Sequence, residues 1–107
     1  MRPGTRVRGS RTGRPIMVLL DLLSRRWALR VIWELRDQAR TARALRTACE
    51  EASPTVLQAR LKELREAGFV ERGEGGYRLT NLGRRLLERV TPLNRLAKSW
   101  AKKVDRA

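Results

Sequence analysis

The sequence of 107 residues contains no histidine and a single cysteine, Cys49. Zinc sites are built from several cysteine and histidine ligands, so this composition excludes them, and one cysteine cannot form an internal disulfide. A chain without disulfides is typical of a reducing compartment. We therefore expect no metal and no cofactor. Cys49 is interpreted as a buried, inert side chain, with a redox-sensitive thiol as the alternative.

Groups suited to catalysis are also scarce. General acid–base chemistry uses a histidine or paired carboxylates, and the three aspartates and eight glutamates lie mostly at spacings typical of helix surfaces. Gly73, Gly75 and Gly76 fall in a predicted hairpin and not in a phosphate-binding loop. We expect that the protein is not an enzyme.

Long apolar runs are absent as well. No stretch approaches the roughly 20 apolar residues that span a membrane. The short apolar segment 16–23 is interrupted by Asp21, is followed by Arg25 and Arg26, and lacks a small-residue cleavage site. The expected location is the cytoplasm, without a membrane partner.

Positive charge, by contrast, is abundant, with a net charge of +14. Residues 1–15 carry +5 and residues 84–107 carry +6, whereas residues 53–83 carry only +1. A polyanionic partner follows from the total, and the distribution suits basic ends that hold phosphates beside a less charged segment that reads bases. The alternative is that the basic ends only aid solubility.

The segment 53–83 predicts a helix, a short hairpin and the start of another helix. Ser53 and Pro54 suit the N-cap and first position of a helix over 53–67, and Gly68 suits its stop. Strands are expected on either side of the turn 73–76, within a wing over 70–79. Helices over 16–23, 27–36 and 41–49 precede this unit, and a three-residue turn at 50–52 completes a helix-turn-helix.

These elements define the predicted organisation. The fold class is mainly α with a small β-hairpin, a winged helix-turn-helix over residues 16–83. Residues 1–15 are rich in Gly, Pro and Arg and are expected to form a flexible basic arm. Residues 81–104 carry an apolar stripe from Leu82 to Val104, and Pro92 should kink this helix or start a new one. A partner subunit is the natural cover for so long a stripe.

The sequence resembles the HxlR-type branch of the MarR-like winged-helix transcription regulators. The matching motifs are LDLLSRRW at 20–27, S-x-x-VL-x-x-RL-x-x-L-x-x-xG at 53–68, VER at 70–72 and LTNLG at 79–83. The resemblance implies a bacterial homodimer that binds double-stranded DNA and dimerises through its first and last helices. Many relatives have a reactive cysteine before the proline that opens the first helix, where this chain has Arg14. The implied dimer interface comprises Leu19, Leu20, Leu23, Leu86, Val90, Leu93, Ala97 and Trp100.

On the predicted helix 53–67, one face combines polar groups with an alanine that permits close backbone approach. Gln58 suits an adenine edge, Lys62 a guanine or phosphate, and Thr55 a phosphate or thymine methyl. Arginines of the preceding helix suit phosphates, and those beside the wing turn suit phosphates or the minor groove. The predicted DNA-binding residues are Ser53, Thr55, Gln58, Ala59, Lys62, Arg43, Arg46, Arg72 and Arg78. The alternative to DNA binding is that this helix face is simply exposed to solvent, beside an ordinary hairpin.

The favoured function is a sequence-specific, double-stranded DNA-binding transcriptional regulator. The alternative is a basic protein of the same fold that binds RNA or DNA without sequence preference. A third hypothesis is a protein-interaction module whose apolar C-terminal face binds another chain.

Overall fold

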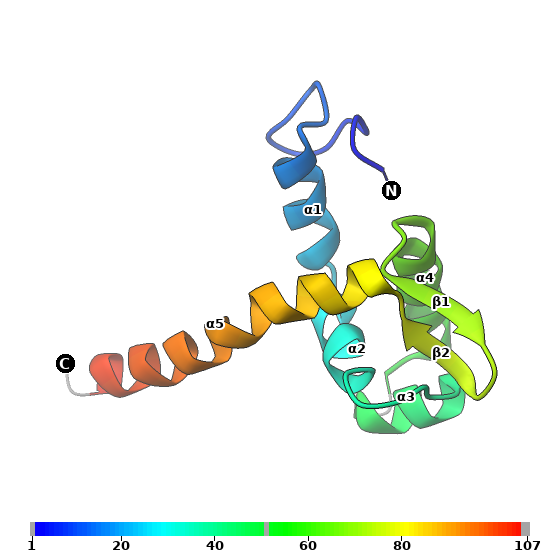
Figure 1. Cartoon of the computed structure of the whole chain (residues 1–107). Coiled ribbons are helices and arrows are strands. Elements are labelled where there is room, and N and C mark those ends of the chain that lie inside the picture. The colour runs from blue at the N-terminus through cyan, green and yellow to red at the C-terminus, as the bar shows by residue number, and fades with distance from the viewer. Residues whose placement is uncertain (1, 51, 106–107) are drawn as a thin grey trace.

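The computed structural model describes residues 2–50 and 52–105. Within these ranges the chain forms five helices and a two-stranded antiparallel hairpin (Figure 1). The predicted fold class, mainly α with a small β-hairpin in a winged helix-turn-helix, is confirmed. The elements are α1 Pro15–Leu23, α2 Ala28–Glu34, α3 Ala42–Ala48, α4 Pro54–Glu66, β1 Val70–Gly73, β2 Gly76–Leu79 and α5 Asn81–Asp105.

The core forms where α2, α3, α4 and the hairpin meet. Helix α4 contributes Leu57, Leu61 and Leu64, all nearly or fully buried, as the spacing of three and four residues predicts. They pack with the apolar residues of α2 and α3 and with Val70 and Leu79 of the hairpin. The same cluster therefore fixes both α4 and the hairpin.

Helix α4 begins and ends close to the predicted residues. Pro54 is its first residue, and Gly68 follows it with a left-handed φ of +88°, the conformation that ends helices at glycine. Ser53 occupies the N-cap position, but its side chain makes no capping hydrogen bond. The predicted N-cap position and the predicted stop are both confirmed.

Helix α2 begins one residue later than expected. The helix was expected to begin at residue 27, but Trp27 is the N-cap with a left-handed φ of +73°, half-buried against the core. The guanidinium of Arg26 lies 5.3 Å from the centroid of its ring. The sharp turn from α1 into α2 imposes this backbone conformation, which a non-glycine residue rarely adopts.

The hairpin is tied to the loop before α3. Gly73 pairs with Gly76, so the wing turn contains only two residues. Tyr77 exchanges two backbone hydrogen bonds with Arg40, at 2.9 and 2.8 Å, which adds a one-residue third edge to the sheet. A Cβ at Gly76 would lie 2.4 Å from the Arg40 carbonyl oxygen, so the backbones can approach only at a glycine.

The segment LTNLG joins the hairpin to α5. The Thr80 hydroxyl donates to the carbonyl oxygen of Gly68 at 2.6 Å and accepts from the backbone N–H of Gly83 at 3.0 Å. Thr80 thereby caps α5 and connects its start to the end of α4. A Cβ at Gly83 would lie 2.1 Å from the Phe69 carbonyl oxygen.

Helix α5 extends away from the rest of the molecule (Figure 1). It is one helix with Pro92 inside it, so of the two alternatives expected for Pro92, a kink or a new helix, the structure excludes the new helix. Residues 91–105 are exposed along their whole length. The far end of α5 lies at the opposite side of the molecule from α4 and the hairpin.

The basic N-terminal segment forms a hydrogen-bonded loop above α1. Gly4 N–H donates to the Gly13 carbonyl oxygen at 2.8 Å, and Val7 and Ser10 exchange two backbone hydrogen bonds. The five arginines of this loop are exposed. That the segment is flexible stays a prediction.

Replacing Gly83 by alanine should destabilise the protein, although alanine is the better helix former by about 1 kcal/mol. The added methyl group would force α5 away from Phe69, a form of overpacking that costs about 1–3 kcal/mol. Urea denaturation should show a lower free energy of unfolding for Gly83→Ala. Ser99→Ala, at an exposed position of the same helix, should show no loss. Equal stability of the two variants would contradict the close contact.

Candidate nucleic-acid interface

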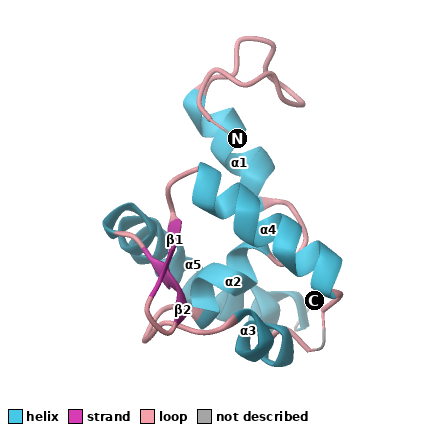
Figure 2. Cartoon of the chain, turned by 90° about the vertical axis from the view of Figure 1, so that its right-hand side faces the viewer, coloured by secondary structure: helices cyan, strands magenta, loops and turns pink. Residues whose placement is uncertain are grey.

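One side of α4 is open to solvent across the helix from its buried leucines. Thr55, Gln58, Ala59 and Lys62 are all exposed there, as the helical wheel predicts. In Figure 2 the right-hand side of Figure 1 faces the viewer, and α4 lies at the front of the molecule. A helix presented in this way can enter a major groove, which accommodates one α-helix.

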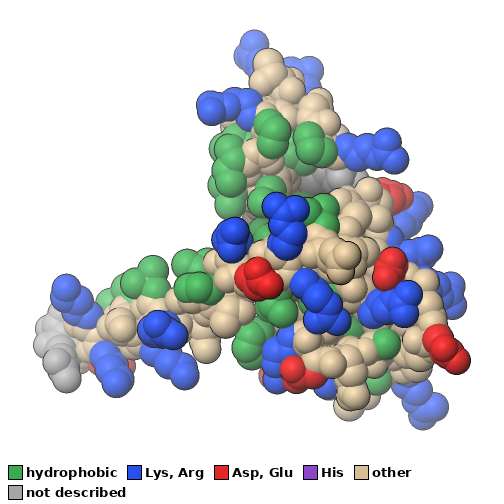
Figure 3. Space-filling model, viewed as in Figure 1, with side chains coloured by type: hydrophobic (Ala, Val, Ile, Leu, Met, Phe, Trp, Pro, Cys, Tyr) green, Lys and Arg blue, Asp and Glu red, His purple; other side chains and the backbone are tan. Residues whose placement is uncertain are grey.

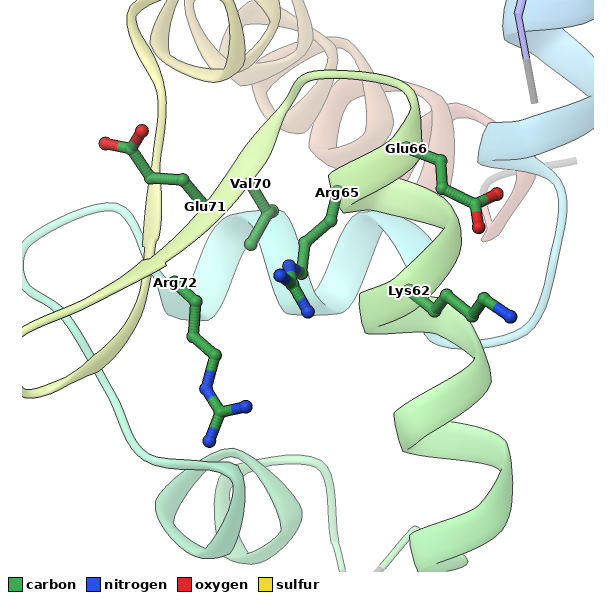
Figure 4. Close-up of a pocket in the computed structure, with 6 residues that line it drawn as sticks. All are labelled: Lys62, Arg65, Glu66, Val70, Glu71 and Arg72. Atoms are coloured by element: carbon green, nitrogen blue, oxygen red, sulfur yellow. The ribbon is translucent and has the colours of Figure 1, made fainter.

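A groove of about 570 Å³ separates the C-terminal half of α4 from β1. Arg65 from α4 and Arg72 from β1 extend toward the same space, whereas the carboxylate of Glu71 extends away from it (Figure 4). The lining residues are Lys62, Arg65, Glu66, Val70, Glu71 and Arg72. The structure therefore brings together cations from the helix and from the wing.

Arg65 was missed by the sequence analysis. It is exposed and lies seven residues after Gln58 and three after Lys62, so all three share one side of α4. The helical spacing in the sequence contained this signal. In the described part of the chain, no carboxylate pairs with Lys62 or Arg65 at ion-pair distance.

The two wing arginines occupy different faces of the hairpin. Arg72 lies opposite Tyr77, with its guanidinium 5.6 Å from the ring centroid, on the face that carries the groove. Arg78 lies opposite Glu71 and donates to its carboxylate at 2.9 Å on the outer face. Of the two, only Arg72 faces the same groove as Arg65.

The two arginines predicted on α3 also differ in their surroundings. Arg43 is exposed, whereas Arg46 donates from Nε to the Ala52 carbonyl oxygen at 3.2 Å and so supports the turn before α4. Both line a groove of about 480 Å³ with Pro54 and Gln58. A phosphate beside the N-terminal end of α4 would lie within reach of this groove.

The acidic residues of the segment 53–83 lie off the open side of α4 or at its edge. Glu63 is mostly buried and pairs with Arg25 and Arg60, and Glu71 pairs with Arg78. Glu63 therefore does not lie on the open side of α4. The near-neutral total of this segment hides a locally basic groove.

A second surface is apolar and lies on α1, α2 and α5. Apolar side chains gather on α1 and along the adjoining side of α5 (Figure 3). Among the predicted interface residues, Leu20, Leu93, Ala97 and Trp100 are exposed, Leu19 and Val90 are half-buried, and Leu23 and Leu86 pack partly against the core. Leu96, with 62% of its surface exposed, was missed. Leu29 and Trp33 of α2 border the same surface through a groove of about 440 Å³.

Cys49 is completely buried in the core. Burial raises the pKa of its thiol, which disfavours the reactive thiolate. The interpretation as an inert core residue is therefore favoured over a redox sensor. The described ranges contain no group of three residues suited to holding a metal ion, and none of their helices is long and apolar enough to cross a bilayer.

Known proteins resemble this chain in sequence and in fold. A family model described as the N-terminal domain of methanogenesis regulatory protein FilR1 matches residues 18–98. No curated protein sequence matches significantly.

Three solved structures share the fold. Quinone-bound YodB from B. subtilis is 26% identical with a TM-score of 0.68, covering 83% of this chain and 97% of that chain. A possible HxlR family transcriptional factor from Thermoplasma volcanium has the same identity and TM-score over 83% of each chain. A transcriptional regulator of the MarR family from Enterococcus faecalis is 23% identical with a TM-score of 0.75, over 96% of this chain and 100% of that chain.

The resemblance to HxlR-type and MarR-like regulators is thereby confirmed. The structural neighbours are transcription regulators, a class that in general does not act by catalysis.

Replacing Arg72 by alanine should weaken DNA binding in a salt-dependent way. If its guanidinium neutralises one phosphate, the slope of log affinity against log salt should decrease by about 0.9 in magnitude. Arg78→Ala removes the same charge from the same hairpin, but from a side chain already paired with Glu71, and should change the slope less. Fluorescence anisotropy at several salt concentrations would measure both slopes. Equal slopes for the two variants would contradict the assignment of the groove face.

Proposed function

Because the chain belongs to the family of the FilR1 N-terminal domain, we propose that it is a transcriptional regulator that binds double-stranded DNA with sequence specificity. One observation carries the proposal. Helix α4 exposes Thr55, Gln58 and Lys62 beside a groove that adds Arg65 and Arg72. A helix with amide and cationic groups next to a basic wing has the chemistry of major-groove recognition.

The proposed contacts are of two kinds, those that recognise bases and those that bind phosphates. Gln58 presents an amide suited to the N6 and N7 edge of adenine, and Lys62 suits a guanine or a phosphate. Arg43, Arg65 and Arg72 surround these residues and suit phosphates on either side of the groove. The exposed N-terminal arginines add positive charge above α1, whereas the distal cations of α5 lie on the opposite side of the molecule. Of the two basic ends of the chain, we propose that the N-terminal one binds phosphates.

The proposed assembly is a homodimer. Leu96 and Trp100 of α5 expose 62% and 66% of their surface, and Leu20 of α1 exposes 52%. Several large apolar side chains exposed on two helices are typical of an interface. Two copies related by a two-fold axis would place their α4 helices in successive major grooves, with half-sites about 10 base pairs apart.

The second candidate function is binding of RNA or DNA without sequence preference, because a protein with a net charge of +14 attracts any nucleic acid. Competition between a duplex selected from a random pool, random DNA and RNA separates the two functions. A regulator prefers the selected duplex, whereas a coating protein treats all three alike.

Substituting Gln58 by alanine should reduce affinity for the selected duplex by about 1–3 kcal/mol, the contribution of one bidentate base contact. Binding to random DNA should hardly change, since that binding depends on phosphates. Gel-shift titrations of both duplexes measure the difference. Gln38→Ala, on the exposed loop before α3, is the matched control and should alter neither affinity. Equal losses for Gln58→Ala on both duplexes would count against base reading.

Replacing Leu96 by glutamate should dissociate the dimer. In a single copy this side chain is exposed, so the folded subunit should tolerate the charge, whereas a buried unpaired carboxylate in an interface would be costly. Light scattering should give the mass of one chain for Leu96→Glu and of two for the wild type. Lys98→Glu, on the polar side of α5, should remain dimeric although it changes the net charge by more. A wild-type monomer at micromolar concentration would refute the assembly.

A further inference from the structure

A chain of ion pairs connects α1 to the proposed recognition helix. Arg25, which follows α1, contacts Asp21 of α1 at 3.2 Å through Nη2 and Glu63 of α4 through Nη1. The second carboxylate oxygen of Glu63 accepts from Arg60 Nη1 at 2.6 Å. Glu63 thus uses both oxygens, one within α4 and one toward the end of α1.

The part of this network on α4 is much less exposed than the other ion pair of the segment 53–83. The side chains of Glu63 and Arg60 are 16% and 18% exposed, whereas those of Glu71 and Arg78 are 47% and 50% exposed. Solvent screening weakens the wing pair, and partial burial strengthens the Glu63 contacts. Arg60 Nε is buried without a partner in the described structure, so Glu63 is the group that compensates the Arg60 charge.

The position of Glu63 on α4 determines what the network can control. At about 100° per residue, Glu63 points roughly 140° away from Gln58, so it contacts the body of the protein while Gln58 faces outward. The leucine stripe buries α4 but is non-directional. The charge-assisted hydrogen bond from Arg25, which lies outside α4, is directional and restricts the rotation of α4 about its own axis. The bond from Arg60, within α4, holds the Glu63 carboxylate in place for this contact.

We propose that Glu63 is a positioning residue for base recognition, which holds α4 at the rotation that presents Gln58 and Lys62 to the DNA. This inference rests on the proposed function, because it assumes that α4 reads a duplex. Arg25 is its partner from the corner between α1 and α2. Since α1 also carries the exposed Ile16 and Leu20, the network connects the proposed dimer surface to the recognition helix.

The test compares Glu63→Gln with Glu71→Gln. Both substitutions remove one negative charge from the segment 53–83, so both should strengthen binding to random DNA slightly. Glu63→Gln should lower the preference for the selected duplex over random DNA about ten-fold, the loss expected from one misplaced base contact. Glu71→Gln should keep the wild-type preference. Circular dichroism at the assay temperature verifies that each variant is folded.

Arg25→Gln removes the same ion pair by changing its more exposed partner, and serves as the test if Glu63→Gln does not fold. Arg25→Gln should also lower the preference for the selected duplex. The variant that combines Glu63→Gln with Arg25→Gln should lose no more of this preference than Glu63→Gln alone. An unchanged preference in folded Glu63→Gln or Arg25→Gln would overturn the positioning role, as would equal losses on both duplexes. Absence of any preference in the wild type would instead overturn the proposed function, and the inference with it.

Discussion

The burial of Leu57, Leu61 and Leu64 is the constraint on which the rest of the structure depends. Each leucine removed from water contributes about 1.5–3 kcal/mol, so α4 is held with this stripe inside. The helical repeat then places Gln58, Lys62 and Arg65 on the outside. The buried side of α4 thus decides which side faces solvent, and the proposed Glu63 contact fixes the remaining rotation of the helix.

The same core positions the wing. Val70 and Leu79 join the leucine cluster from the hairpin, and the bridge between Arg40 and Tyr77 ties the hairpin to the loop before α3. Arg72 consequently lies across a groove from Arg65. Glu71 pairs with Arg78 away from the groove, so that three cations line it beside Glu66, although the whole segment is nearly neutral. Composition alone could not reveal this, because pairing is decided by three-dimensional contacts.

Much of the fold could be predicted because its signals are local. The leucine spacing, Pro54 and Gly68 define α4, and the glycines at 73, 75 and 76 define the wing turn. The left-handed backbone at Trp27 was missed because tertiary packing imposes it at a residue that does not favour it. The third sheet edge at Arg40 was missed because a one-residue bridge has no periodicity.

The candidate site was predicted less completely than the fold. The exposed face of α4 followed from the helical wheel, but Arg65 was overlooked at its C-terminal end. Arg72 and Arg78 appear equivalent in the sequence, and only the pairing register of the strands separates the groove face from the outer face.

The central claim is that α4 and the groove beside β1 form the DNA-binding face. Amide chemical-shift mapping of the isotope-labelled protein during titration with its selected duplex tests this most directly. The account predicts that the largest changes occur over Ser53–Arg65 and at Arg72, with small changes at the far end of α5. Changes concentrated on α5 or confined to the N-terminal arginines, with α4 unaffected, would contradict it.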